Sequence, residues 1–372
     1  MATIESPRNE RRFRVPPRLS AIRQPLSAAF HLSTRATNLS LLLIVVAQVV
    51  TGFGSFLVGV PSGRWVVWLH SIGAFSLVLL LIWKYRIILR SLRRHGPGLW
   101  ALPSLLLLAL LLASLLTGLF WSTIGLPEFD GFSGLTVHVG LSVALALVLL
   151  PHARAGWPRV CRRDFFGRRA LLRDGALLAG GLVLWRGSEA VSAIAGLSGA
   201  RRRFTGSRLA RSFSGNDFPA NSWLLDNPDP IDVIGWRLRV HGSVYEPLSL
   251  SLDNVPHSEA LTATIDCTGG WYSTQHWEGI SVARVLQQAG LRSGTRSIVV
   301  RSVTGYWRRF PLSAANGMLL ATHVGGERLE HLHGAPMRLV TPGRRGFEWV
   351  KWVTDVEAST WSPWLKWPLP IS

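Results

Sequence analysis

The stretch Ala263-Thr-Ile-Asp-Cys-Thr-Gly-Gly-Trp-Tyr272 places one thiol, that of Cys267, between an extended segment and a glycine turn. The β-branched residues Thr264 and Ile265 favour a strand, and Gly269-Gly270 allow positive φ and close approach of a ligand to the backbone. A cysteine at a strand end is well placed to offer a thiolate to a soft metal. The alternative is a small buried hydrophobic residue, which is the usual state of a free cysteine.

The composition around this stretch indicates a membrane protein. The 372 residues carry a formal net charge of +19, yet the mean hydropathy is positive at +0.25. The arginines lie in blocks between apolar runs, which is typical of membrane topology and differs from the uniformly basic surface of a nucleic-acid-binding protein. We therefore expect the lipid bilayer, and no nucleic acid, as a partner. Two cysteines, Cys161 and Cys267, cannot build a disulfide framework.

Five apolar runs predict about five transmembrane helices. A basic arm at 1–38 precedes them, and Asn38 or Ser40 could cap the first helix. Pro151 is expected to disturb the end of the fourth. No internal repeat is evident. The predicted spans are residues 41–60, 65–83, 99–121, 135–150 and 176–197.

The basic residues predict the orientation of these spans. The arm at 1–38, the loop after the second span and the block after the fourth are rich in arginine, so they are expected in the cytoplasm. The loops at 61–64 and 122–134, the second with Glu128 and Asp130, are expected outside. An odd number of spans then places everything after about residue 200 on the periplasmic side of a bacterial inner membrane. Cys161 and Cys267 would lie on opposite sides and could not pair.

Two histidines, His70 and His138, lie inside predicted spans, each near the outer end. An ionisable residue within a span is a functional-site hypothesis by default, and two imidazoles at equal depth could take both axial positions of one haem. We therefore expect a four-helix, cytochrome b-like membrane domain at 39–153 with a b-type haem. The alternative is that both histidines bond to headgroups or loop carbonyls. His152 could serve a second haem only with a partner at the inner end of another span.

Paired arginines precede the fifth span, within an expected loop and helix at 154–200. Arg162-Arg163 and Arg168-Arg169 each stand ahead of aromatic or leucine residues and an apolar segment. This resembles a twin-arginine export signal, which would suit a domain that folds around its cofactor before it crosses. Ordinary positive-inside charge is the alternative.

From Arg201 onward the composition is that of a soluble domain. Alternating apolar residues over 236–241 predict a half-buried strand, and further strands are expected at 298–300, 337–340 and 350–356. A short helix is expected over 282–289, ended by Gly290. Strands outnumber helices and do not alternate with them, so the expected class of this domain is α+β.

Three further segments accompany Cys267: Gly215-Asn-Asp-Phe-Pro219, His331-Leu-His-Gly-Ala-Pro-Met-Arg-Leu-Val340 and Pro342-Gly-Arg-Arg-Gly-Phe-Glu-Trp-Val-Lys-Trp352. As a set they resemble the molybdopterin-binding domain of the sulfite oxidase superfamily, which includes the periplasmic methionine sulfoxide reductase catalytic subunit. The resemblance covers about 213–358, within an expected domain at 201–372. It implies a molybdenum ion held by a pterin dithiolene and by the Cys267 thiolate. The residues it implies for pterin binding are Asn216, Ser302, His333, Arg338, Trp349, Val350 and Lys351.

One departure from that family bears on the substrate. Sulfite oxidases tend to follow the cysteine with arginines that hold an anion, whereas Trp271-Tyr-Ser-Thr274 stands here. This favours a small neutral substrate near Trp271, Tyr272 and Tyr306, with Tyr306 as a catalytic residue beside Cys267.

The expected function is that of a membrane-anchored molybdenum oxidoreductase. Its haem would exchange electrons with the quinone pool or another membrane carrier, and its molybdenum site would reduce an S-oxide or N-oxide. The alternatives are oxidation of sulfite or another sulfur compound, an anchor without haem that is served by a separate cytochrome, and a cofactor-free binding module.

Overall fold

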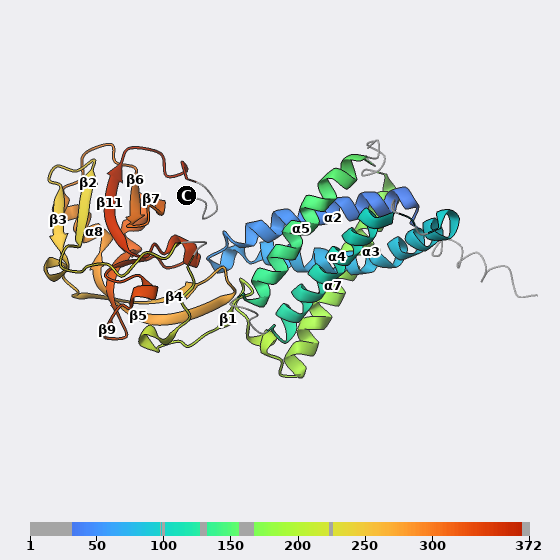
Figure 1. Cartoon of the computed structure of the whole chain (residues 1–372), viewed down its shortest axis with the longest axis horizontal. Helices are drawn as coiled ribbons and strands as arrows, with labels where there is room; N and C mark the ends of the chain where they lie inside the picture. Colours follow the sequence, from blue (N-terminus) through green and yellow to red (C-terminus); the bar gives the residue numbers. More distant parts are fainter. Residues whose placement is uncertain are drawn as a thin grey trace, which may run out of the picture.

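Two differently built parts make up the chain, a helical bundle and a β domain that follows it. The computed structural model describes residues 32–96, 98, 101–126, 132–155, 167–222 and 226–366. Figure 1 shows the bundle at one end of the long axis and the β domain at the other. The predicted basic arm as far as residue 31, the acidic residues Glu128 and Asp130, Cys161 and the first arginine pair, Arg162-Arg163, lie outside the described residues.

The five predicted spans correspond to five helices of the bundle. Each is long and apolar enough to cross a membrane, by length and composition. The bounds are α2 Thr34–Ser55, α3 Trp65–His95, α4 Leu102–Thr123, α5 Gly134–Ala155 and α7 Arg168–Ile194.

The helix ends differ from the predicted ones. The cap of α2 is Ser33, whose side chain accepts from the Ala36 N–H at 3.2 Å, so the prediction of Asn38 or Ser40 is wrong. The same helix stops at Ser55 instead of residue 60. α5 continues through Pro151 to Ala155, so Pro151 removes one helical hydrogen bond without ending the helix.

The bundle packs α2 on α3, α4 on α5 and α7 on α3. Small residues let α7 approach α3 closely: the Ser76 hydroxyl, which is buried, donates to the Leu177 carbonyl at 3.1 Å. A Cβ atom on Gly181 would overlap Ser76 and the Ile72 carbonyl. Close backbone contact of this kind is typical of helices that associate in lipid, where burial of apolar surface gives no preference for protein over lipid.

The β domain contains two mixed sheets, which agrees with the expected α+β class. One pairs β1 and β5 in parallel, and the other pairs β2 and β11 in parallel; the remaining pairs are antiparallel. The six-stranded sheet has β1 Arg208–Leu209, β4 Glu259–Asp266, β5 Trp271–Ser281, β8 Leu319–Val324, β9 Glu327–Arg328 and β10 Arg338–Val340. The five-stranded sheet has β2 Arg237–Gly242, β3 Leu248–Ser251, β6 Ser297–Ser302, β7 Trp307–Pro311 and β11 Val353–Ser359.

The short helix α8, Val282–Ala289, forms as predicted and buries the predicted apolar face against the larger core. Its N-cap is Ser281, whose side chain accepts from the Arg284 N–H at 3.2 Å. The last strand begins at Val353 and not at residue 350, because residues 349–351 form an irregular segment beside the six-stranded sheet. That segment carries part of the candidate site.

Candidate functional site

Cys267 lies in the tight turn that joins β4 to β5. Its N–H donates to the Trp271 carbonyl at 2.8 Å, and its carbonyl accepts from the Gly270 N–H at 3.1 Å. The Gly269 N–H donates to Sγ at 3.3 Å. Gly270 has φ +98°, a conformation that glycine adopts without strain. Burial raises the pKa of the Cys267 thiol, while the Gly269 N–H, Arg345 and Lys351 lower it. The turn therefore holds one thiol in a fixed direction among cations.

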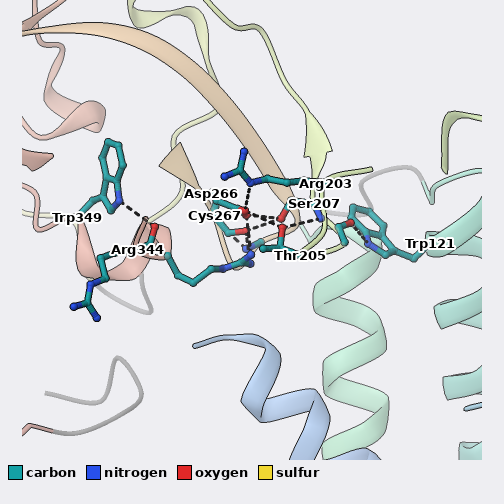
Figure 2. A network of polar contacts seen from close by, with 11 residues as sticks. Trp121, Arg203, Thr205, Ser207, Asp266, Cys267, Arg344 and Trp349 are labelled. Atoms are coloured by element: carbon teal, nitrogen blue, oxygen red, sulfur yellow. Dashed lines mark hydrogen bonds and ion pairs between the residues drawn. The ribbon is translucent and has the colours of Figure 1, made fainter. Parts of the chain in front are cut away.

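Asp266 organises a buried polar network next to this thiol. Its carboxylate accepts from Arg345 Nη1 at 2.8 Å and forms an ion pair with Arg203 Nε at 3.0 Å. The hydroxyls of Thr205 and Ser207 donate to it at 2.8 and 2.7 Å (Figure 2). Arg345 Nη2 also donates to the Cys267 carbonyl at 3.0 Å. The network fixes the backbone of Cys267, and in it Arg345 is paired with the Asp266 carboxylate.

This network was not predicted from the sequence, in which no role is assigned to Asp266, Arg344 or Arg345. A carboxylate that ends an apolar strand directly before a cysteine was the signal available, since a charged residue at such a place needs a buried partner. Its partners at 203–207 and 345 are far apart in the chain, so only the fold brings them together.

Arg338 and Lys351 form a pair of cations with no carboxylate bonded to either among the described residues. Gly334 brings them together: a Cβ there would lie 3.1 Å from Arg338 Cβ and 3.0 Å from Lys351 Cβ. Arg338 is 1% exposed and lies over the Trp277 ring, with its carbon Cζ 5.1 Å from the ring centre. Nη1 donates to the His333 carbonyl at 3.0 Å, and Nε has no partner. Burial lowers the pKa of Arg338 to about 9, although the nearby Cys267 raises it.

Lys351 Nζ donates to the carbonyls of Leu332 and Asn221, at 2.6 and 3.0 Å. Burial, and next the charge of Arg338, lower the pKa of Lys351 to about 7. Arg338 is buried and Lys351 is half-buried, with Asp226 raising the pKa of Lys351 from a distance. A cation removed from water is costly without a bonded counterion, so the pair suits an anionic ligand such as a phosphate.

This pair predicts a pH dependence of stability for the cofactor-free protein. The pKa of Lys351 is about 7 in the fold and 10.5 ordinarily. Between those values the unfolded chain binds a proton that the folded chain lacks, so stability rises with pH across this window. We expect a higher melting temperature at pH 9.5 than at pH 7.5 for protein made in a host that lacks the pterin. Lys351→Met should reduce that difference, whereas Arg284→Met, at an exposed site, should leave it. An unchanged difference in Lys351→Met would contradict the assignment.

His333 has an unprotonated ring nitrogen that could accept a hydrogen bond from a ligand. Its Nε2 lies 2.7 Å from the Asn216 carbonyl, which can only accept, so Nε2 carries the proton and Nδ1 does not. The ring is 3% exposed and packs on Phe218 with 4.0 Å between ring centres. Nδ1 is buried without a partner. Burial and then Arg338 lower the pKa of His333 to about 4, so the ring is neutral at pH 7.

Four other predicted pterin-binding residues, Asn216, Ser302, Trp349 and Val350, form hydrogen bonds within the protein. The Asn216 amide bridges the Arg328 carbonyl and the Glu330 N–H, at 2.9 and 3.1 Å. Ser302 Oγ accepts from the Thr304 hydroxyl at 3.0 Å. The Trp349 N–H donates to Gly346, and the Val350 carbonyl accepts from Leu339. These contacts support the loops around the site, and pterin binding by the four residues stays a prediction.

Tyr306 also supports a loop. Its hydroxyl donates to the Phe347 carbonyl at 2.6 Å, within the short helix η8, Gly346–Glu348. Gly346 in turn lies against Cys267, since a Cβ there would be 3.1 Å from Cys267 Cα. Burial raises the pKa of the Tyr306 phenol above its ordinary value. Contact of Tyr306 with substrate stays a prediction.

The donor set fits a molybdenum–pterin group. It consists of one oriented thiol, two cations without a bonded carboxylate and one bare imidazole nitrogen. Over the described ranges, no cluster of three or more His, Cys, Asp or Glu residues could hold a metal ion by itself. A metal here would thus take most of its ligands from a cofactor, with one from the protein.

Comparison with known families decides what this part of the chain is. Residues 225–367 match the family model of the oxidoreductase molybdopterin binding domain. This is a molybdopterin-binding oxidoreductase domain. The matched residues begin after β1, well beyond the end of α7 at Ile194, and they include Cys267, His333 and Arg338.

Three relatives of this molybdopterin domain illustrate the range of the similarity. The uncharacterized oxidoreductase YuiH of Bacillus subtilis is 29% identical over 138 residues, which are 36% of this chain and 69% of that protein. Mitochondrial sulfite oxidase of Rattus norvegicus is 31% identical over 185 residues, covering 40% of this chain and 33% of the relative. The protein-methionine-sulfoxide reductase catalytic subunit MsrP of Xanthomonas axonopodis is 28% identical over 141 residues, which are 32% of this chain and 44% of that protein. The chain thus spans less than half the length of the last two relatives.

A second candidate site lies in the bundle, where the rings of His70 and His138 are brought together as predicted. Their centres are 6.2 Å apart and their planes meet at 88°. His138 Nδ1 lies 2.9 Å from the Ser114 carbonyl, so it carries the proton. His70 Nδ1 lies 3.1 Å from the Thr51 hydroxyl, which already donates to the Ala47 carbonyl at 2.7 Å and must accept. In both rings Nε2 is therefore the bare nitrogen.

The two histidines sit in matching helix pairs. Thr51-Gly52 of α2 contacts His70 of α3, and Thr117-Gly118 of α4 contacts His138 of α5. A Cβ on Gly52 or Gly118 would lie 3.3 or 3.0 Å from the Cε1 atom of the facing ring. Two Thr-Gly pairs and two histidines form too short a pattern to be evident among apolar helices.

Proposed function

We propose that this protein is a membrane-anchored molybdenum oxidoreductase in which His70 and His138 hold a b-type haem. The haem assignment is based on the two unprotonated Nε2 atoms. Two imidazoles bound on opposite sides of one iron have ring centres roughly 6 Å apart, because each adds about 2 Å of metal–nitrogen bond and about 1 Å within the ring. The separation of 6.2 Å matches this, and each Nδ1–H bond orients its ring as metal-bound histidines require.

Molybdenum–molybdopterin is proposed at Cys267, whose thiolate would bind the metal. Arg338 and Lys351 would bind the pterin phosphate, and His333 Nδ1 would accept a pterin N–H. The bound cofactor supplies oxygen-atom transfer and two-electron chemistry. The chain orients the thiol through the Asp266–Arg345 network and places cations around it, so that the thiolate is favoured once metal replaces its proton.

The proposed substrate is a small neutral S-oxide or N-oxide. Arg345, whose charge acts on the Cys267 thiol, is occupied by Asp266 at 2.8 Å, and Arg338 is assigned to the pterin phosphate. Neither guanidinium would then be available to an anionic substrate, whereas Trp271 and Tyr272 offer aromatic surface. Oxidation of sulfite is the second candidate, favoured by the 31% identity with a sulfite oxidase.

The proposed location is the bacterial inner membrane, with the molybdopterin domain on the periplasmic side. Five helices of sufficient length support the anchoring, and the arginine blocks at the end of α3 and between α5 and α7 support the orientation. Electrons would come from the quinone pool or another membrane carrier, pass through the haem and reach the substrate at the molybdenum site.

Metal analysis combined with visible spectroscopy of the purified full-length protein tests this proposal. We expect one molybdenum atom and one dithionite-reducible b-type haem per chain, and we expect dimethyl sulfoxide to reoxidise the reduced haem. Molybdenum without a b-type spectrum would remove the haem and leave a plain anchor. Absence of molybdenum from protein made in a pterin-producing host would remove the enzyme proposal. Reduction of the haem by sulfite would establish the second candidate in place of the first.

A further inference from the structure

The end of α4 lies directly against the turn that carries Cys267. A Cβ atom on Gly270 would lie 2.5 Å from Trp121 Cζ2 and 2.9 Å from Cη2. The edge of the indole thus packs on the backbone of the turn, and its Nε1 donates to the Gly206 carbonyl at 3.2 Å (Figure 2). Leu135 of α5 reaches the same place, since its Cδ2 would be 3.2 Å from that Cβ. Helices α4 and α5 therefore both contact Gly270.

Arg208 joins the same two elements by hydrogen bonds. Its backbone N–H donates to the Gly270 carbonyl at 2.8 Å, in the parallel pairing of β1 with β5. Its guanidinium donates to the Trp121 carbonyl and lies over the Trp121 ring, 5.1 Å from the ring centre. A cation at the C-terminal end of a helix is favoured by the helix dipole. One residue thus binds the end of α4 and the Cys267 turn at once.

The contacts between α4 and the Cys267 turn continue along α4 and α5 to the histidine pair His70 and His138. Trp121 stands three residues after Gly118, or about 4.5 Å along the helix. Gly118 contacts the His138 ring, with 3.0 Å between its would-be Cβ and Cε1. Leu135 likewise stands one turn before His138 on α5. A continuous path of contacts therefore runs from His138 through Gly118 and Trp121 to Gly270, whose N–H bonds the Cys267 carbonyl at 3.1 Å.

We propose that Trp121 is a positioning residue for electron transfer between the haem and the molybdenum site, held in place by Arg208. This rests on the proposed function. Each transfer would take one electron from the haem held by His70 and His138, which would be oxidised, and would give it to the molybdenum group held by Cys267, which would be reduced. Two transfers and two protons from water convert an S-oxide to a sulfide and one water molecule. Trp121 is not itself oxidised: it fills the space between bundle and turn, excludes water and keeps the two at contact distance.

The test compares Trp121→Ala, the conservative Trp121→Phe and the control Trp65→Ala in full-length holoprotein. Trp65 lies at the start of α3 and is 56% exposed. Two rates are measured: reoxidation of dithionite-reduced haem by dimethyl sulfoxide, and turnover of dimethyl sulfoxide with reduced benzyl viologen, a soluble donor that bypasses the haem. We expect Trp121→Ala to slow haem reoxidation at least tenfold and to keep viologen turnover within twofold. Trp121→Phe should restore most of the rate, and Trp65→Ala should behave like the parent. Reoxidation at the parental rate in Trp121→Ala would overturn the proposal.

Hydrogen–deuterium exchange separates this proposal from the proposed function. Trp121→Ala should speed exchange of the Arg208 and Gly270 amides, because their shared contact with α4 is lost, while amides of α8 keep the parental rate. Unchanged exchange at both amides would overturn the docking contact whatever cofactors are bound. A parent protein that lacks a b-type spectrum would instead overturn the haem assignment, and with it the electron-transfer role of Trp121.

Discussion

Cys267→Ser is expected to lower turnover with reduced benzyl viologen by more than about 100-fold. Loss of residues that only support a metal ligand costs about 10–100-fold, so loss of the ligand itself should cost more. The hydroxyl of serine stays protonated where a thiol gives a thiolate, and it is a poor ligand for a soft metal. The Asp266 network holds the backbone of the turn and does not involve Sγ, so the variant should fold.

The control for this prediction is Cys161→Ser, the same chemical change at the only other cysteine of the sequence. It should leave turnover at the parental level. The b-type spectrum should persist in both variants, because haem binding depends on the bundle. A Cys267→Ser protein with parental turnover and a full complement of molybdenum would contradict the role of Cys267 as a metal ligand.

His70→Ala and His138→Ala are each expected to abolish the b-type absorption. Each variant removes one of the two histidines that would hold the haem, so the bundle would offer a single imidazole to the iron. Quinol-dependent turnover should fall by more than about 100-fold, whereas viologen-dependent turnover at Cys267 should stay within twofold. This contrast separates loss of the haem from loss of the fold.

His152→Ala is the matched control for the histidine pair. His152 lies in the last turn of α5, on the same helix as His138. We expect a parental spectrum from this variant. An unchanged spectrum in either His70→Ala or His138→Ala would contradict the axial assignment, and loss of half the haem in His152→Ala would indicate a second haem.

Much of the bundle was predictable because the signals are local. A run of apolar residues sufficient to cross a bilayer needs no partner to be recognised, and the arginine blocks between runs predict orientation in the same way. Helix ends were less predictable: Ser33 caps α2 from a position ahead of the apolar run. Both histidines were predictable as a pair, because the second and fourth spans run in the same direction and both histidines lie near the start of their span.

The candidate site was predictable as a set of residue types, and less so as a set of contacts. The resemblance named Cys267, His333, Arg338 and Lys351, and the structure gathers the last three beside Gly334 and Phe218. It also named Asn216, but could not show that the Asn216 amide is occupied by segment 328–330. The sequence does not show which backbone groups a side chain will bind by hydrogen bonds.

The sequence by itself determined the membrane-spanning pattern, the α+β class and the thiol at a strand end, because each depends on neighbouring residues in one segment. Only the tertiary structure decided that Asp266 is neutralised by Arg345 and Arg203, and that Trp121 packs on Gly270. These contacts join residues dozens to more than a hundred positions apart. They exist because packing of β1 on β5 and docking on the end of α4 bring those residues together, and no local pattern encodes such a distance.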